Sequence, residues 1–272
     1  MARRRIAILA DTHVGLEGMQ PSGREYGDCS SVLSSAVADL LYEDEPDQTF
    51  FVGDIVNRGF AEEYQRARRI LAPLQRAFEP ILGNHELQRG SVSDFENHWS
   101  TRAVRSTIFS DFPTIVLNSG IENLPDDQWH GVLDDIQLRM LEEALVVHRD
   151  VPLFIFCHHP IEGTVRGSAD PMGFLTNSGE LRRLIERRAK PVVLISGHTH
   201  QQDLIRDRHI TYVGCPPLAF WPHAYLSGVV DRSELTIKAV RVVDSIDKSP
   251  DPRAGEYEAH DTFDRVVTIP LD

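Results

Sequence analysis

Asp11-Thr12-His13 directly follows the apolar run Ile6-Ala7-Ile8-Leu9-Ala10 near the start of the chain. A run of this kind predicts a buried β-strand. A carboxylate and an imidazole two positions apart, just past the carboxyl end of a strand, can both turn toward one point. That edge is where open α/β sheets build their sites. An isolated Asp-x-His pair also occurs in solvated turns, so its meaning depends on the rest of the sequence.

Four later apolar runs end in the same way, in residue types that bind metals. They stop at Asp54, at Asn84-His85, at His158 and at His198-Thr199-His200. Because the carboxyl ends of neighbouring parallel strands meet at one edge of a sheet, we expect these side chains to gather in one place.

Helical periodicity fills most of the chain between these runs. The apolar spacing predicts helices over residues 30–42, 62–78, 91–105, 134–147 and 180–189. In the fourth of these helices we expect four residues to face inward, namely Ile136, Met140, Leu141 and Leu145. An apolar run at 114–117 predicts a further strand. After residue 200 the alternation ends, and the runs at 210–213, 225–230, 235–243 and 266–269 predict short strands, mostly antiparallel.

Strand–helix alternation followed by a β-meander predicts a mixed α/β (α+β) fold, with helices on the outer faces of the sheets. We expect one domain over residues 1–272. Residues 244–262 are polar and contain prolines, so they predict an irregular C-terminal loop, and residues 263–272 are expected to hold the final strand.

The overall charge argues against a protein that tracks nucleic acid. The chain has 272 residues and a formal net charge of -13, whereas nucleic-acid binders usually present a basic face. Its three cysteines form no Cys-x-x-Cys pair, which favours reduced thiols and a cytoplasmic location. No stretch approaches the ~20 apolar residues of a membrane span. These features suit a small substrate or a metal site, and they leave the oligomeric state open.

The residue types at the strand ends predict a metal centre. Carboxylates, an amide and imidazoles without thiolate suit Mn, Fe or Zn. The ligands are too many for one ion, and two ions need a shared carboxylate, for which Asp54 is the natural candidate. Two ions about 3.5–4 Å apart can hold a bridging hydroxide that attacks a phosphoryl group. A histidine beside the ions could protonate the leaving group.

The ordered motifs resemble those of the calcineurin-like metallophosphoesterases, over residues 5 to about 215. They are Asp11-x-His13, Gly53-Asp54, Gly83-Asn84-His85-Glu86, His158 and Gly197-His198-x-His200. The resemblance implies a four-layer αββα sandwich of two mixed sheets. It places one metal on Asp11, His13, Asp54 and His200, and a second on Asp54, Asn84, His158 and His198. It makes His85 the general acid, with Asp54 also in the catalytic set.

Other details bear on the branch of the family and on the substrate. Asn57-Arg58 stands where the similar Ser/Thr phosphatase motif carries an aspartate before its arginine, and purple acid phosphatases have a tyrosine ligand at the Asn57 position. The compact length and His158-His159-Pro160 look more like bacterial cyclic-nucleotide phosphodiesterases. Arg58 and Asn84 are candidates to contact a small phosphate ester, a nucleotide among the options.

Several alternatives remain open from the sequence. The substrate can be a phosphate monoester or diester, and a small-molecule phosphatase or a Ser/Thr protein phosphatase are alternatives. A non-catalytic scaffold of this fold, like one retromer subunit, would be expected to have lost ligands. For His159 we favour a hydrogen-bonded core role over metal binding. We favour packing over base stacking for the aromatic residues of the 216–225 loop, which is one of three predicted rim loops with 14–28 and 162–176.

Overall fold

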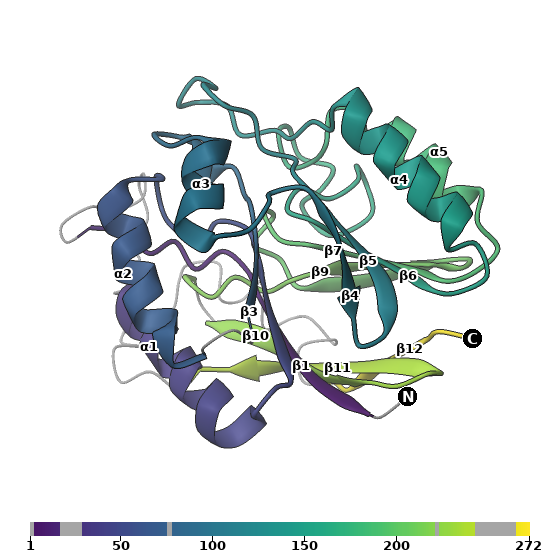
Figure 1. The fold of residues 1–272 in the computed structure, drawn as a ribbon, viewed down its shortest axis with the longest axis horizontal. Coiled ribbons are helices and arrows are strands. Elements are labelled where there is room, and N and C mark those ends of the chain that lie inside the picture. The colour runs from purple at the N-terminus through teal and green to yellow at the C-terminus, as the bar shows by residue number, and fades with distance from the viewer. Residues whose placement is uncertain (1–2, 17–28, 75–77, 221–222, 243–264) are drawn as a thin grey trace.

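Two six-stranded sheets pack face to face (Figure 1). The computed structural model describes residues 3–16, 29–74, 78–220, 223–242 and 265–272. The first sheet has the order β12-β11-β10-β1-β2-β3. Its strands are β1 (Arg4–Leu9), β2 (Gln48–Val52), β3 (Phe78–Ile81), β10 (Ala224–Val230), β11 (Glu234–Arg241) and β12 (Val267–Pro270). Strands β1, β2 and β3 run parallel, and β10, β11 and β12 extend the sheet through antiparallel pairs.

The second sheet has the order β4-β5-β6-β7-β9-β8, with parallel pairing from β5 through β6 and β7 to β9. Its strands are β4 (Arg105–Phe109), β5 (Phe112–Leu117), β6 (Leu153–Cys157), β7 (Val192–Ser196), β8 (Asp203–Asp207) and β9 (Ile210–Gly214). The parallel strands of both sheets are therefore the ones that carry the predicted ligands at their carboxyl ends.

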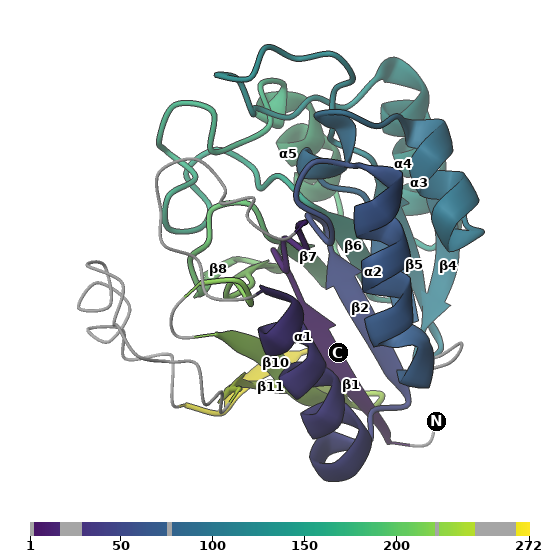
Figure 2. The ribbon, with the colours of Figure 1, turned by 90° about the vertical axis from the view of Figure 1, so that its left-hand side faces the viewer.

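Helices cover both outer faces, which confirms the predicted αββα arrangement. On the first sheet lie α1 (Cys29–Asp39), which continues as a π-helical turn (Leu40–Asp44), and α2 (Ala61–Leu71), which ends in a 3₁₀ turn (Ala72–Leu74). Figure 2 shows α1 and α2 in front of β1 and β2. On the second sheet lie α4 (Asp135–Val147) and α5 (Ser178–Glu186), while α3 (Val92–Trp99) follows a short 3₁₀ turn (His85–Leu87).

Successive side chains of a parallel strand enter opposite faces of the sheet, and both faces are buried, which explains why these strands are continuous apolar runs in the sequence. In β1, Ile6 and Ile8 join the core between the two sheets, whereas Ala7 and Leu9 join the core under α1 and α2. Strands buried on both faces need apolar residues at every position. In the second sheet, Ile155 of β6 packs toward α4 and α5 in the same way.

Aromatic rings join the two sheets. Phe50 of β2 stacks on Phe156 of β6, with ring centroids 4.3 Å apart and planes 10° from parallel. Phe109 of β4 meets Phe50 edge-on at 5.1 Å. Because all three side chains are fully buried, this contact fixes one sheet against the other. It thereby brings the carboxyl ends of both sets of parallel strands to the same end of the sandwich.

The structure corrects several sequence predictions. Strands β4 and β8 were not expected, because each exposes part of one face and carries polar residues. The helix predicted over 91–105 is shorter, and β4 begins at Arg105. The final strand spans Val267–Pro270, rather than the whole of 263–272. The loop predicted at 244–262 lies outside the described residues, so that loop and the single domain stay predictions.

The prediction of which α4 residues face inward was also partly wrong. Ile136 is 70% exposed, and Gln137 is buried in its place. The Gln137 amide accepts a hydrogen bond from the Asn118 N–H (2.8 Å) and donates one to the Asn118 carbonyl (2.9 Å). This paired contact with the end of β5 satisfies a buried polar group. It turns the helix so that Leu141 and Leu145 meet the sheet as predicted.

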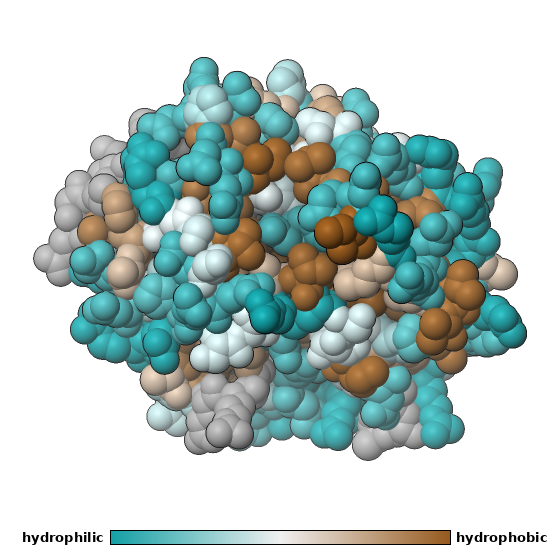
Figure 3. All heavy atoms as spheres, turned by 45° about the horizontal axis from the view of Figure 1, so that its top comes forward, coloured by the Kyte–Doolittle hydropathy of each residue, from teal (hydrophilic) through white to brown (hydrophobic). Residues whose placement is uncertain are grey.

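The described surface gives no sign of a membrane-spanning element. Among the residues that the structure describes, no helix has both the length and the apolar character needed to cross a bilayer. On the face drawn in Figure 3, hydrophobic residues are scattered among hydrophilic ones.

The inter-sheet contact yields a test of stability. We expect Phe156→Ala to lower the free energy of unfolding by roughly 3–5 kcal/mol, because it removes a buried ring and leaves a cavity. Urea denaturation followed by circular dichroism measures this loss. The matched control is Ile136→Ala, at an exposed side chain of α4, for which we expect a change within about 0.5 kcal/mol. Equal losses in the two variants would contradict the assigned core.

Candidate functional site

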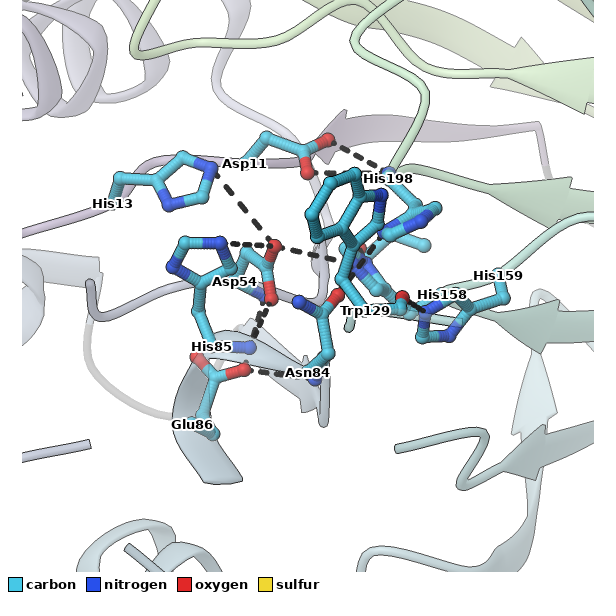
Figure 4. Close-up of polar contacts among 12 residues, drawn as sticks. Asp11, His13, Asp54, Asn84, His85, Glu86, Trp129, His158, His159 and His198 are labelled. Carbon is cyan, nitrogen blue, oxygen red and sulfur yellow. Dashed lines mark hydrogen bonds and ion pairs between the residues drawn. The ribbon is translucent and has the colours of Figure 1, made fainter. Parts of the chain in front are cut away.

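All seven predicted metal ligands and His85 lie together at the shared strand-end edge. Turns after β1, β2 and β3 contribute five of these residues, and turns after β6 and β7 contribute the other three. Figure 4 shows most of them as sticks. A cavity of about 400 Å³ opens above them. His13, Asp54, Asn84, His85, His198 and His200 are among the residues that line this cavity.

The backbone at this edge is unusual. Five of the candidate ligands have a positive φ, a conformation that Asp and His tolerate better than most residues. They are Asp11 (54°), His13 (43°), Asp54 (52°), His198 (68°) and His200 (54°). Such sparsely populated backbone is found at functional sites, where the surrounding structure must hold it in place.

Glu86 holds the turn that carries Asp54. Its fully buried carboxylate accepts hydrogen bonds from four backbone N–H groups. The donors are those of Asp54 (3.1 Å), Ile55 (2.6 Å), Val56 (3.0 Å) and Gly83 (2.8 Å). Burial and the nearby Asp54 carboxylate raise the pKa of Glu86 to about 7, while these donors favour its ionised form. The side chain thus ties the turn after β2 to the turn after β3.

Asp54 occupies the centre of the site. One of its carboxylate oxygens, Oδ1, accepts a hydrogen bond from the His85 N–H at 2.9 Å. The other, Oδ2, lies 3.2 Å from His158 Nε2, 3.9 Å from His13 Nε2 and 4.0 Å from His85 Nε2. Only glycine fits at position 83, because an added Cβ would lie 2.2 Å from Asp54 Oδ1. The chain therefore packs closely around a single carboxylate that faces three imidazoles.

One cluster of donor atoms lies on the β1 side of Asp54. His200 Nε2 is 3.3 Å from Asp11 Oδ1 and 3.3 Å from His13 Nε2. Ligand atoms of Asp11, His13 and His200 all lie within 4.8 Å of one another. Burial and the neighbouring His85 keep the pKa of His13 well below its usual value. His13 is therefore neutral, which is the form that binds metals.

A second cluster lies on the β6 and β7 side, and its lone pairs converge. His158 Nδ1 donates to the Val52 carbonyl at 2.8 Å, so in the neutral ring Nε2 carries the lone pair. This nitrogen faces the side-chain oxygens of Asp54 and Asn84, each at 3.2 Å. His198 is similar, because Nε2 donates to the Met172 carbonyl and Nδ1 faces Asn84 Oδ1 at 3.0 Å.

Acceptor atoms that face one another at this distance repel unless a positive charge lies between them. Either a proton on His158 or a cation can supply it. Burial opposes the protonated form, yet the Asp54 carboxylate raises the pKa of His158 to about 9. Burial and His159 hold the pKa of His198 well below its usual value, so this ring stays neutral. The donor set of this cluster therefore fits a divalent cation.

His85 borders the first cluster, because its ligand atom lies within 4.8 Å of those of His13 and Asp54. Its Nδ1 donates to the main-chain carbonyl of Asn57 at 2.6 Å, which leaves Nε2 directed toward Asp54 and the cavity. Its side chain is 23% exposed, whereas the imidazole of His158 is fully buried. A histidine with one ring nitrogen fixed and the other facing an open cavity can exchange a proton with a bound molecule.

The remaining sequence predictions have mixed outcomes. His159 makes hydrogen bonds in the core, as expected, to the Ser119 hydroxyl and the Trp129 carbonyl, each at 2.8 Å. Burial and the neighbouring His158 lower its pKa to about 3. Arg58 is not among the residues that line the cavity, and its contact with phosphate stays a prediction.

The rim loops were found only in part. Gly167, Asp170, Pro171 and Gly173 line the cavity, as the 162–176 loop predicted. Phe220, from the 216–225 loop, packs on His200 with ring centroids 4.3 Å apart. Residue 221 and most of the 14–28 loop lie outside the described residues. Trp129 lines the cavity but was not expected, because nothing in its polar loop marks it by periodicity.

Comparisons with known proteins agree with this geometry. A family model described as Calcineurin-like phosphoesterase matches residues 4–202. The chain is 29% identical over 223 residues to "Glycerophosphodiester phosphodiesterase GpdQ" of Enterobacter lignolyticus, covering 78% of this chain and 76% of the relative. It is 28% identical over 216 residues to "3',5'-cyclic adenosine monophosphate phosphodiesterase CpdA" of Vibrio vulnificus, covering 78% and 75%.

Among solved structures, a dimetal phosphatase from Danio rerio superposes with a TM-score of 0.73 at 15% identity, over 99% of both chains. This likeness supports the fold alone. The match to the family model covers most of the chain and includes every candidate ligand. The chain therefore belongs to the calcineurin-like phosphoesterase family.

Proposed function

We propose that the protein hydrolyses phosphodiesters at a centre of two metal ions. As a member of its family, it is a metal-dependent phosphoric ester hydrolase. The observation that carries the proposal is the position of Asp54, whose Oδ2 lies between the two clusters of donor atoms. A shared carboxylate is what a pair of neighbouring cations requires.

The ligands divide between the ions by position. The first ion would take Asp11, His13 and His200, and the second would take Asn84, His158 and His198, with Asp54 common to both. Nitrogen and oxygen donors without thiolate are compatible with Mn, Fe or Zn. Two such cations would lower the pKa of water and neutralise the charge that develops on the phosphoryl oxygens.

The chain's own residues supply the remaining chemistry. His85 directs Nε2 into the cavity, and in this proposal it donates the proton that the leaving alkoxide needs. The carbonyl of Asn57 accepts a hydrogen bond from its Nδ1–H at 2.6 Å, which favours this orientation of the ring. Asn84 lines the cavity beside His85, and its amide is placed to contact a phosphoryl oxygen as well as a cation.

A phosphodiester is favoured over the alternatives because both relatives named above are phosphodiesterases. The Ser/Thr phosphatase alternative loses support because a main-chain carbonyl, not a carboxylate, positions His85. A scaffold without activity would have little reason to keep every donor atom and His85 together. Cys29, Cys157 and Cys215 all lie in the described part of the chain and form no disulfide there, in keeping with a reducing compartment such as the cytoplasm.

Removal of the shared carboxylate tests the metal centre. We expect Asp54→Ala to lose bound metal, because both clusters lose a ligand. Elemental analysis of protein dialysed against metal-free buffer measures the ions per chain. Asp126→Ala is the matched control, since Asp126 lines the same cavity but belongs to neither cluster. Two ions still bound to Asp54→Ala would rule out the shared-ligand assignment.

Removal of His85 tests the acid. We expect His85→Ala to keep its metal content and to lose turnover by roughly 10²–10⁴-fold. The loss should be larger for an alkyl ester than for a p-nitrophenyl ester, because nitrophenolate leaves without a proton. His148→Ala, a change at the end of α4, should leave kcat unchanged. Full activity of His85→Ala on an alkyl ester would refute this role.

A substrate panel tests the reaction class. We expect metal-dependent turnover of bis(p-nitrophenyl) phosphate and of cyclic nucleotides to exceed that of p-nitrophenyl phosphate, when each is assayed with Mn, Fe, Zn or no metal. Chelation should abolish all activity, and added metal should restore it. A preparation stripped of metal that works undiminished would contradict the proposal, and metal binding without any turnover would favour the scaffold.

A further inference from the structure

The outer wall of the cavity carries an aromatic side chain that the mechanism does not use. Trp129 is 42% exposed, yet it lines the same cavity as Asp54 and His85. In the view of Figure 4 its indole lies in front of the candidate ligands. A large aromatic surface left open to water beside a phosphate site is suited to cover a flat group of the bound molecule.

The loop that carries Trp129 is fixed by a buried histidine. His159 Nε2 donates to the Trp129 carbonyl at 2.8 Å, so its Nδ1 is the acceptor of the Ser119 hydroxyl. Gly131 lies so close that an added Cβ would be 2.6 Å from the His159 ring. Because the loop is already anchored on the protein, a group that stacks on the indole orders little else when it binds.

The other lining residues indicate what kind of group fits. Gln88, Gln128 and Gln201 line the cavity, and amide side chains of this type pair with the polar edge of a nucleobase. Within the described part of the cavity wall there is no lysine or arginine. The nearby Arg89 is paired with Asp126 at 2.9 Å. Two carboxylates, Asp126 and Asp170, also line the cavity, and Arg89 balances the first of them. The wall therefore suits a planar group with hydrogen-bonding edges and no added negative charge, and it offers no cation for a second phosphate.

We propose that Trp129 is a specificity-determining residue that stacks against the nucleobase of a nucleoside phosphate ester carrying one phosphate. The proposal rests on the proposed function, because the phosphate is taken to face the metal ligands. It goes further by naming the organic part of the substrate and the side chain that selects it. His159 acts as the positioning residue that holds this wall against the site.

A matched pair of ligands isolates the contribution of the base. Adenosine 5′-monophosphate and ribose 5-phosphate carry the same phosphate and sugar, and they differ in the adenine. We measure the affinity of both for the Mn-loaded protein by isothermal titration calorimetry. Base stacking on an aromatic side chain predicts that the nucleotide binds roughly 5- to 150-fold more tightly to the wild type.

Variants then assign this preference to one residue. In Trp129→Ala we expect the ratio of the two affinities to fall to about 2 or below, while ribose 5-phosphate binds as before. Trp129→Phe should keep most of the preference because it keeps an aromatic face. Tyr42→Ala is the control, since Tyr42 is 79% exposed on a remote turn and should change neither affinity. Metal content and the urea midpoint of each variant are measured in parallel.

Each other result overturns the proposal. Equal affinities of the two ligands for the wild type would mean that no base subsite exists. An equal loss of both ligands in Trp129→Ala would make the residue structural. Phosphocholine, which carries a quaternary ammonium group, is measured as a third ligand. If Trp129→Ala loses more affinity for phosphocholine than for the nucleotide, the indole binds a cation instead of a base. In these cases the Mn-loaded wild type still hydrolyses bis(p-nitrophenyl) phosphate, whereas failure of the proposed function is seen as the absence of that hydrolysis.

Discussion

The contact between the Glu86 carboxylate and four main-chain N–H groups is the constraint on which the site depends. It joins the turn after β2 to the turn after β3, two segments that are 30 residues apart in sequence at Val56 and Glu86. Buried donors without an acceptor would each cost about 1–3 kcal/mol. Because those donors flank Asp54, the same bonds fix the carboxylate in its left-handed backbone position. The turn that carries the Asp54 carboxylate is therefore held by hydrogen bonds between Glu86 and the main chain, which involve no candidate ligand side chain.

The positions of the candidate ligands at the strand ends could be predicted because two rules agree there. One concerns the residue types of a buried strand, and the other concerns where the ends of parallel strands meet. A buried parallel strand must be apolar at every position, so a single Asp or His after the run marks the edge of the sheet. From the sequence alone, this argument predicts that Asp11, His158 and His198 lie at one place. It could not divide the donor atoms between two ions, and the family resemblance supplied that division. The structure brings these atoms into overlapping groups around Asp54, with Asp11, His13 and His200 in one group and His158 and His198 beside Asp54 in another.

The features that the sequence concealed depend on contacts between distant segments. Gln137 is buried because it binds the main chain of Asn118, and no helical periodicity signals that bond. Trp129 sits in a polar loop whose path is set by His159, so its place in the cavity follows from tertiary structure. The αL backbone at the ligands is similar, since the tolerance of Asp and His for that conformation permits it without predicting it. Local pattern therefore predicted where the candidate ligands and one rim loop lie, but not the place of Trp129 in the cavity wall.

His85 and His159 show how two neighbouring parts of the site are held by the same means. In each ring a nitrogen donates to a main-chain carbonyl, that of Asn57 for His85 and that of Trp129 for His159. For His85, this leaves the second nitrogen facing the cavity; for His159, the second nitrogen accepts from Ser119 and no site remains for a metal. The His159 ring also packs on His198, with centroids 4.0 Å apart. One buried imidazole thus contacts both a candidate ligand and the loop of the aromatic wall. A shift of that ring would move both, which argues that the cavity wall and the candidate metal ligands are positioned as one unit.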